Sequence, residues 1–478
     1  MARPSVSFVS LGCAKNLVDS EKMLGLLAEA GCAIVGEGAG PADVLVVNTC
    51  GFLSAARDEA LAVLREAAQQ KRRGTIRRLV VAGCLVQRDG EKLMEAIPEI
   101  DAIVGVNDRA SLVEAVVAKS QNVEKSKSRK VEKSKSQDQS SPELVQVTTS
   151  RRLDGKGVFV RAYRPGEWTG DNRSDQARLR LTPPHYAYLR ISEGCDQKCT
   201  FCTIPFIRGP MHSKTVEEIL AEARELIEDG CVELNLIGQD TTSYGRDIGY
   251  GPGLAGLLRA LNGLDGIAWI RLMYAYPTEF SDEMIDALAE CERVVKYVDL
   301  PLQHISDRVL RAMHRRGTRQ ETEALLAKLR RRMPGAAIRT TFIAGFPGET
   351  EAEFEELRRF VREFEFDAVG VFAYSNEEGT PAFRIKEQVP ADAISARVEA
   401  LMLAQQEIAF RKAAARRGER LRVLIDGVGQ DRHFMGRHAG QAPEVDSVTY
   451  VRGRRLTPGR FIDVRCVGSK GYDLVTTA

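Results

Sequence analysis

The 478-residue sequence has almost no net charge and lacks any long apolar run. Lys and Arg total 68 and Asp and Glu total 66, which gives a formal net charge of +2. This balance argues against a grossly basic nucleic-acid coat and against an acidic disordered tail. No stretch of about 18 apolar residues is present, and the first residues lack the features of a signal peptide. We therefore expect a cytoplasmic protein that makes no contact with a membrane.

Hydrophobic residues make up 44% of the sequence and charged residues 28%, which is typical of a globular protein. The length exceeds that of one typical core and predicts two or three domains. Ten cysteines are present. Because a reducing compartment disfavours structural disulfides, metal binding is the first function to consider for them.

The first 118 residues alternate short β-branched runs with segments that carry apolar residues at helical spacing. The predicted strands are Val6–Ser10, Ala42–Val47 and Arg78–Ala82, and the predicted helices are Leu17–Ala30 and Ser54–Lys71. Alternation of this kind predicts a parallel sheet with helices on both faces. Residues 1–118 should therefore form a doubly wound α/β domain.

Residues 119–142 differ sharply in composition from the segments around them. The hexapeptide VEKSKS occurs at 123–128 and again at 131–136, and the stretch has almost nothing to bury. We expect a disordered linker, and this interpretation is favoured over a nucleic-acid-binding tail.

Residues 143–417 contain six apolar segments separated by helical ones. The predicted strands are Tyr186–Ser192, Val232–Ile237, Trp269–Met273, Tyr297–Leu300, Ile338–Ile343 and Ala368–Phe372. Six β/α repeats predict a partial (βα)6 barrel, with its site at the carboxyl ends of the strands.

The last segment, residues 418–478, has no helical period. Short predicted strands at Leu421–Ile425, Thr449–Val451 and Phe461–Val467 are separated by Gly-rich turns. A small antiparallel β-barrel is expected.

Three cysteines, Cys195, Cys199 and Cys202, stand in the string EGCDQKCTFCTIP directly after the first strand of the second domain. Three thiolates leave one iron of a cubane cluster without a protein ligand, whereas a structural zinc site has four ligands. The spacing therefore predicts an iron–sulfur cluster with an open iron. The alternative is a zinc loop with a distant fourth ligand.

A second trio, Cys13, Cys50 and Cys84, follows three predicted strands of the first domain. Ligands of doubly wound sheets bind beyond the carboxyl ends of the strands, so these thiols should converge there on a second cluster. The alternative is that each is a small buried hydrophobe. That alternative is our interpretation for the remaining four cysteines, Cys32, Cys231, Cys291 and Cys466.

The C-x3-C-x2-C motif after the first strand of a six-fold β/α repeat resembles that of the radical S-adenosylmethionine superfamily. Outside the linker, the chain resembles the methylthiotransferase branch of that superfamily. The matching strings are LGCAKNLVDSE, VVNTCGF, VAGCL, SEGCDQKCTFCTIPFIRG and TTFIAGFPGET. This resemblance implies an N-terminal three-cysteine cluster domain, a radical SAM domain and a C-terminal TRAM domain.

Within that branch the chain resembles the ribosomal protein aspartate methylthiotransferases, which modify small-subunit ribosomal protein number twelve. It has GCAKN at 12–16 and PLQH at 301–304, where the tRNA enzymes tend to have GCQMN and PVQSG. It also has YAYP at 274–277 instead of a Ser-Pro-His-Pro type string. The alternatives are a tRNA methylthiotransferase acting on an isopentenylated adenosine beside the anticodon, and a non-catalytic metal- or RNA-binding module.

The resemblance also implies two 4Fe-4S clusters and S-adenosylmethionine as cofactors. The cluster on Cys195, Cys199 and Cys202 would bind S-adenosylmethionine and yield a radical that removes hydrogen from the aspartate β-carbon. The cluster on the first trio would hold the sulfur, and a second S-adenosylmethionine would supply the methyl group. An external electron donor is implied, because the cofactors carry the difficult chemistry and must be reduced.

Other side chains are weaker candidates, each with a structural alternative. Phe201 could pack on adenine or shield the cluster, and Gln239 could contact S-adenosylmethionine or cap a turn. Gly345, in the string GFPGE, could allow close approach of the backbone to S-adenosylmethionine or simply form a turn. Arg208 and Arg339 could bind a carboxylate or form ordinary ion pairs. No catalytic residue is evident, and His304 and Tyr274 are weak candidates for meeting the target aspartate.

The expected TRAM domain is mildly basic, with ten Lys and Arg against seven Asp and Glu from residue 418 onward. Barrels of this size bind RNA through basic faces and stacking aromatics. Contact with RNA and docking onto the ribosomal protein are both compatible with this composition.

Overall fold

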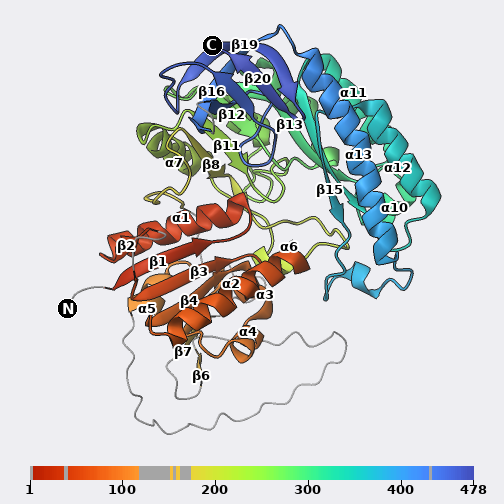
Figure 1. The fold of residues 1–478 in the computed structure, drawn as a ribbon. Helices are drawn as coiled ribbons and strands as arrows, with labels where there is room; N and C mark the ends of the chain where they lie inside the picture. Colours follow the sequence, from red (N-terminus) through yellow and green to blue (C-terminus); the bar gives the residue numbers. More distant parts are fainter. Residues whose placement is uncertain (1–3, 37–40, 118–150, 154–157, 162–173, 430–432) are drawn as a thin grey trace, which may run out of the picture. The chain divides into compact units, whose positions relative to one another are not determined.

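The computed structural model describes residues 4–36, 41–117, 151–153, 158–161, 174–429 and 433–478 (Figure 1). The chain divides into two compact units. The N-terminal unit comprises residues 1–179 together with 206–209, and the C-terminal unit comprises 180–205 and 210–478. The predicted linker, residues 119–142, lies outside the described residues.

The N-terminal unit is built on one sheet with the strand order β2-β1-β3-β4-β5-β7-β6. Its strands are β1 (Ser5–Ser10), β2 (Ala33–Val35), β3 (Val44–Thr49), β4 (Arg78–Gly83), β5 (Ala102–Val104), β6 (Arg151–Leu153) and β7 (Val158–Arg161). Its helices are α1 (Ala14–Glu29), α2 (Ser54–Arg72), α3 (Cys84–Asp89), α4 (Glu91–Ala96) and α5 (Ser111–Val117). All neighbouring strands pair in parallel except β6 and β7.

Alternation along the strands gives the sheet two apolar faces. Val44 and Val46 belong to the core that α1 and α5 cover, whereas Leu45 and Val47 belong to the core that α2, α3 and α4 cover. Successive side chains of a strand point to opposite faces, so both faces must be buried under helices. The doubly wound fold is confirmed.

Described residues that follow the charged stretch contribute to the first unit. β7 pairs in parallel with β5, and the Leu179 amide donates to the Glu21 carbonyl at 3.1 Å. β7 and the described residues 174–179 are therefore grouped with the first unit. Composition marks the charged stretch as a boundary, but the chain returns to the same sheet after it.

The C-terminal unit contains a six-stranded parallel sheet with the order β8-β11-β12-β13-β14-β15. These strands are β8 (Tyr186–Arg190), β11 (Glu233–Ile237), β12 (Trp269–Leu272), β13 (Val294–Gln303), β14 (Ala337–Ala344) and β15 (Ala368–Ala373). The sheet follows chain order and does not close, so the partial (βα)6 barrel is confirmed.

Helices and short elements connect these strands. They are β9 (Ser192–Glu193), α6 (Ile204–Arg208), β10 (His212–Ser213), α7 (Val216–Glu228), α8 (Gly253–Asn262), η1 (Pro277–Glu279), α9 (Asp282–Glu290), α10 (Asp307–Ala312), α11 (Arg319–Arg332), α12 (Glu351–Phe364), η2 (Pro381–Arg384) and α13 (Ala391–Ala415). Three of the helices, α7, α11 and α12, begin with a capping box between a threonine and a glutamate three residues later. Each box satisfies amide groups that a helix start would otherwise leave unpaired.

Five strands at the C-terminus form a closed barrel with the order β16-β17-β18-β20-β19. They are β16 (Arg420–Val428), β17 (Phe434–His438), β18 (Thr449–Arg452), β19 (Phe461–Lys470) and β20 (Asp473–Thr477). The barrel was expected to be antiparallel, but β18 and β20 pair in parallel. A closed ring with an odd number of strands cannot alternate direction throughout, so one parallel pair is required.

Buried ion pairs join this barrel to the parallel sheet within the C-terminal unit. Glu233 on β11 lies 2.9 Å from Arg271 on β12 and 2.7 Å from Arg437 on β17. Trp269 packs edge-to-face on Phe461, with ring centroids 4.8 Å apart. The small barrel therefore shares a core with the larger one. Among the described residues, no helix combines the length and apolarity needed to cross a bilayer.

Candidate functional site

The three N-terminal thiols follow neighbouring strands. β1, β3 and β4 adjoin in the sheet, and Cys13, Cys50 and Cys84 come just after their carboxyl ends. The order 2-1-3-4-5 reverses direction between β1 and β3, and this switch point is where doubly wound sheets bind ligands. Gly12 has a φ of +93°, and a Cβ there would lie 2.8 Å from the Cys50 Cβ. Only glycine allows this turn to approach Cys50 so closely.

The thiols of this trio are near enough to affect one another's ionisation. Burial raises the pKa of Cys84 to about 12, the Arg208 guanidinium opposes this rise, and Cys13 and Cys50 add to it. Burial also raises the pKa of Cys50, and Cys13 adds to that effect. Thiols of this kind ionise when a metal or a cation compensates the charge, so the donor set fits a bound cluster.

The second trio lies in the loop after β9 in the C-terminal unit. Burial raises the pKa of Cys195 to about 12. Burial also raises the pKa of Cys202, and Cys199 adds to that rise. The Ile204 amide donates to the Cys202 sulfur at 3.4 Å, and Arg315 Nη1 lies 4.0 Å from the Cys199 sulfur. N–H donors and cations stabilise thiolates bound to iron. This trio also fits a three-thiolate cubane.

The other four cysteines lie in the hydrophobic core, as predicted. All ten thiols are free of disulfides. Among the described residues, no three His, Cys, Asp or Glu side chains are grouped as ligands of a single metal ion. A cubane differs because each thiolate binds a different iron. The core cysteines are Cys32, Cys231, Cys291 and Cys466.

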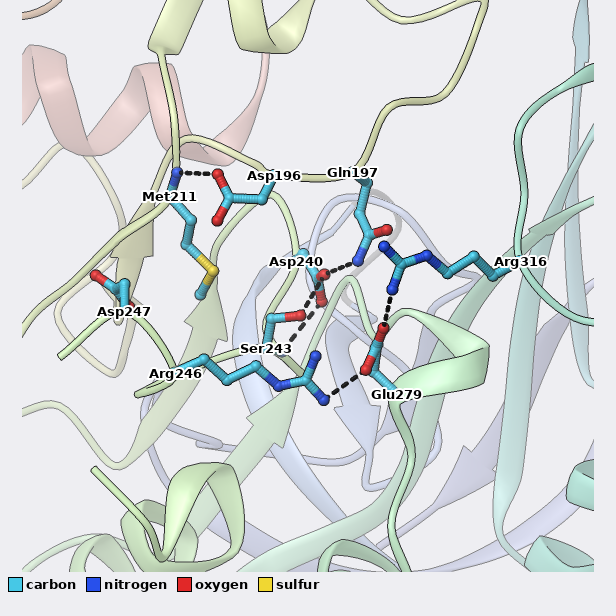
Figure 2. A pocket seen from close by; sticks show the side chains of 9 residues that line it. All are labelled: Asp196, Gln197, Met211, Asp240, Ser243, Arg246, Asp247, Glu279 and Arg316. Atoms are coloured by element: carbon cyan, nitrogen blue, oxygen red, sulfur yellow. Dashed lines mark hydrogen bonds and ion pairs between the residues drawn. The ribbon is translucent and has the colours of Figure 1, made fainter. Parts of the chain in front are cut away.

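A polar hollow of about 290 Å³ lies at the loop that carries the second trio. Figure 2 shows the side chains that line it. It is lined by Asp196, Gln197, Met211, Asp240, Ser243, Arg246, Asp247, Glu279 and Arg316. Its lining carries four carboxylates and two guanidinium groups. Two of its residues, Asp196 and Gln197, stand between Cys195 and Cys199 in sequence, so the loop that carries the second trio also lines the hollow.

Asp240 organises one side of this hollow. It is 2% exposed, and its Oδ2 accepts from Gln197 Nε2 at 2.9 Å and from the Ser243 hydroxyl at 2.7 Å (Figure 2). On another side, Glu279 pairs with Arg246 at 2.5 Å and with Arg316 at 3.4 Å. The polar groups are thus held in place before any ligand arrives.

Two of the predicted S-adenosylmethionine contacts follow β11 and β14. Gln239 Nε2 donates to Glu193 Oε1 at 2.7 Å, while its buried Oε1 accepts no hydrogen bond from the described residues. Gly345 has a φ of +80°, and a Cβ there would clash with Ile394. Gln239 therefore keeps an acceptor at the strand end, whereas the packing against Ile394 already accounts for Gly345.

Phe201 and Arg339, the other two predicted contacts, lie in packed surroundings. Phe201 packs against an apolar cluster that includes Phe346. Arg339 Nη1 donates to Asp299 Oδ1 at 2.8 Å, and its Nε lies 3.4 Å from Asp446 Oδ1. The structure thus gives the Arg339 guanidinium two carboxylate partners within the chain.

The two residues suggested to meet the target aspartate differ in exposure and in their contacts. Tyr274 is half-buried with a φ of +58°, and its amide donates to Asp299 Oδ2 at 3.0 Å. Such a conformation is costly for a bulky residue and often marks a functional position. His304 is 1% exposed, accepts from the Ser306 amide at 3.0 Å, and lies 3.5 Å from Glu349. His304 is enclosed in the core.

Sequence reasoning missed several residues of the site. Asp196 and Gln197 could have been found, because they stand inside the cysteine motif itself. Arg315 gave no signal: its guanidinium lies 4.0 Å from the Tyr276 ring and near Cys199, and both contacts depend on the fold.

Three family profiles match the chain. They are the radical SAM superfamily over residues 189–361, the uncharacterized protein family UPF0004 over 5–105 and the TRAM domain over 418–478. A solved structure of TsrM from Kitasatospora setae, a radical S-adenosylmethionine methyltransferase with cobalamin and a 4Fe-4S cluster bound, is similar with a TM-score of 0.53. It is 15% identical and covers 80% of this chain and 77% of its own, so it shows a likeness of fold.

Curated relatives match over nearly the whole length. One from Symbiobacterium thermophilum, named ribosomal protein uS12 methylthiotransferase RimO, is 45% identical over 99% of this chain and 90% of its own length. Another of the same name from Geobacter sulfurreducens is 39% identical over 99% and 98%. The chain therefore belongs to the RimO family of radical SAM methylthiotransferases.

Proposed function

We propose that this chain adds a methylthio group to the β-carbon of an aspartate in ribosomal protein uS12. The observation that carries the proposal is the pairing of two three-thiol sites in one chain, in a family whose named members act on uS12. A metal-binding module would need only one of these sites, and a complete ligand set would serve it better.

Cys195, Cys199 and Cys202 would hold one 4Fe-4S cluster with S-adenosylmethionine, and Cys13, Cys50 and Cys84 would hold the other. When bound, these groups supply radical hydrogen abstraction, the inserted sulfur and the methyl group, fed by an external electron donor. The chain's own residues bind these groups and orient them. Arg315 and the Ile204 amide stabilise the thiolates of the second trio.

Gln239 is the best-supported contact to S-adenosylmethionine outside the cysteines, because its buried Oε1 is an available acceptor at the end of β11. We assign a smaller part to Phe201, Arg339 and Gly345, whose contacts within the chain explain their positions. Tyr274 is our candidate for contact with the target aspartate, and the enclosed His304 has a structural role.

The hollow beside the second trio would receive the substrate segment. Ribosomal proteins bind a polyanion and are rich in Lys and Arg. A lining of four carboxylates and two guanidinium groups suits a basic segment that also presents a carboxylate. Asp240 and Glu279, each already fixed by partners, would orient that segment.

We also propose that the TRAM barrel contacts RNA in the cytoplasm, where ribosomal subunits are made. Exposed basic residues gather between β18 and β19 and on β19, including Arg454, Arg455, Arg460 and Arg465. If they bind phosphates, affinity for ribosomal RNA should fall as salt rises, and an Arg454→Glu, Arg455→Glu double variant should flatten that dependence. An unchanged salt dependence would leave docking onto protein as the role of this face.

A direct assay tests the main proposal. The protein is reconstituted with iron and sulfide without oxygen and given S-adenosylmethionine and a reductant. It is then offered either uS12 or an anticodon-loop RNA carrying isopentenyladenosine. We expect mass spectrometry to find the methylthio gain on an aspartate of uS12. A gain on the RNA and not on uS12 would establish the tRNA alternative instead.

A further inference from the structure

A four-residue segment from the radical SAM loop belongs to the other unit. Residues 206–209 are part of the N-terminal unit, whereas Pro205 and Pro210 on either side belong to the C-terminal unit. Within the segment, Ile207 is 1% exposed and packs with Cys84 and Val106, while Phe206 remains 49% exposed. The segment is seated in the N-terminal unit by Ile207 and by the residue that follows it.

That next residue, Arg208, touches a predicted cluster ligand. Its side chain is 2% exposed, and its Nη2 donates to the Cys84 sulfur at 3.2 Å. Its Nη1 lies 3.0 Å from Oδ2 of Asp19, which is equally buried. One guanidinium thus bridges a sulfur and a carboxylate in the interior.

A second arginine of the same burial shares the Asp19 carboxylate and pairs with another carboxylate besides. Arg109 Nη1 lies 3.3 Å from Asp19 Oδ1 and 2.7 Å from Asp175 Oδ1. Arg109 is thus a matched internal comparison for Arg208: same counter-ion, same burial, different neighbour.

We propose that Arg208 is a positioning residue for the N-terminal cluster: its contact holds Cys84 as a ligand, and its charge makes the bound cluster easier to reduce. The inference rests on the proposed function for the presence of that cluster. A guanidinium stays charged under all physiological conditions. An N–H donor to a ligating sulfur and a nearby cation both favour the more negative, reduced form of a cluster.

The test measures the reduction potential of the N-terminal cluster alone. In the full chain, Cys195, Cys199 and Cys202 are replaced by Ala so that only this cluster can form, and the parent should bind about four irons. Electron paramagnetic resonance then follows a reductive titration of the parent and of Arg208→Gln, Arg208→Lys and Arg109→Gln. We expect Arg208→Gln to lower the reduction equilibrium about tenfold, which is about 59 mV for one electron. Arg208→Lys, which keeps the charge, should retain most of the parent's reduction potential. Arg109→Gln should have the same potential as the parent.

The outcomes are separable. A parent without iron overturns the proposed function, and the inference with it. A parent that binds iron but shows the same potential in Arg208→Gln, or the same shift in Arg109→Gln, overturns only the role of Arg208. If Arg208→Gln does not fold, Arg208→Met, which also removes the charge and the N–H donor, decides: a potential equal to the parent's overturns the role, and an equilibrium constant for reduction lowered about tenfold supports it.

Discussion

An arginine lies beside one sulfur of each cysteine trio. Arg208 donates to Cys84 at 3.2 Å, and Arg315 Nη1 lies 4.0 Å from Cys199. Three thiolates on a cubane leave an excess of negative charge that a buried site must compensate. With clusters bound at the two trios, the two arginines would provide that compensation from different parts of the chain.

Removing one cysteine from each trio should affect different reactions. Cys13→Ala should leave reductive cleavage of S-adenosylmethionine intact and abolish methylthio transfer, because only the sulfur-holding cluster is affected. Cys199→Ala should abolish both reactions. The measurements are 5'-deoxyadenosine released and the mass of uS12. Cys32→Ala, in the core, is the control and should keep both. Loss of cleavage in Cys13→Ala would contradict separate roles.

His438 should make stability depend on pH. Burial lowers its pKa to about 3, with Arg416 and Arg271 adding to the effect, from 6.5 in the unfolded chain. The unfolded state therefore binds more protons between these values, and stability is lost as pH falls below 6.5, by about 1.4 kcal/mol per unit. We expect His438→Gln to remove this slope.

Urea unfolding at pH 7, 6 and 5 would measure this dependence of stability on pH. Tryptophan fluorescence can monitor the unfolding, because Trp269 packs on Phe461 within the C-terminal unit. Exposed His314, replaced by Asn, is the control and should keep the wild-type slope. Equal slopes in His438→Gln and the wild type would refute the assignment.

At this scale the sequence predicts candidate ligands, but it does not predict the side chains that contact them. The six cysteines could be chosen because each follows a predicted strand end or lies in a spaced motif. Arg208 could not be assigned to Cys84, because the two are 124 positions apart and meet only through the fold. The 1% exposure of His304 could not be predicted from its sequence position either, because it depends on the packing around it.

Among the elements, the turn after β14 shows how packing can imitate a ligand-binding motif. Gly345→Ala should destabilise the protein in two ways, because the backbone has a φ of +80° and the new methyl group would meet Ile394. Gly379→Ala shares only the first cost, since its φ is +88° but nothing lies within 4 Å of its Cβ position.

We expect the variant at 345 to lose about 1–3 kcal/mol more than the variant at 379, the usual cost of overpacking. The free energy of unfolding in urea measures this difference. Equal losses would mean that Ile394 moves aside at no cost.

All six strands of the partial barrel were predicted, five of them within two residues at each end, whereas β13 (Val294–Gln303) extends three residues beyond the predicted 297–300 at both ends. Short or polar strands were not. β2 and β5 have three residues each, and β17, Phe434–His438, carries glycine, arginine and histidine. Their pairing comes from neighbouring strands, which local sequence does not encode.

For the whole molecule, the small barrel and the radical SAM sheet form one unit. Arg437 is 3% exposed and links Glu233 at 2.7 Å to Asp426 at 2.8 Å. Tyr297 donates to Asp446 at 2.8 Å. Domain profiles place a boundary at 418, but the buried charges on both sides need one another.

Removing that arginine should therefore destabilise the entire C-terminal unit. Arg437→Met leaves the buried Glu233 and the partly buried Asp426 with fewer partners and should cost about 3–5 kcal/mol. Arg465→Met, at an exposed position of β19, should change stability by about 0.5 kcal/mol at most. Urea unfolding compares the two, and a small barrel that melts alone in Arg437→Met, with the sheet unaffected, would contradict a shared core.

The placement of residues 206–209 has a consequence for inheritance. A gene fragment that ends at the codon for Leu179 encodes the N-terminal unit without Ile207, which packs on Cys84, and without Arg208. Recombination that exchanged this unit between two genes at its apparent boundary would separate a cysteine from its arginine. The two cluster domains should therefore be transmitted as a single evolutionary module, and natural shuffling should leave them joined.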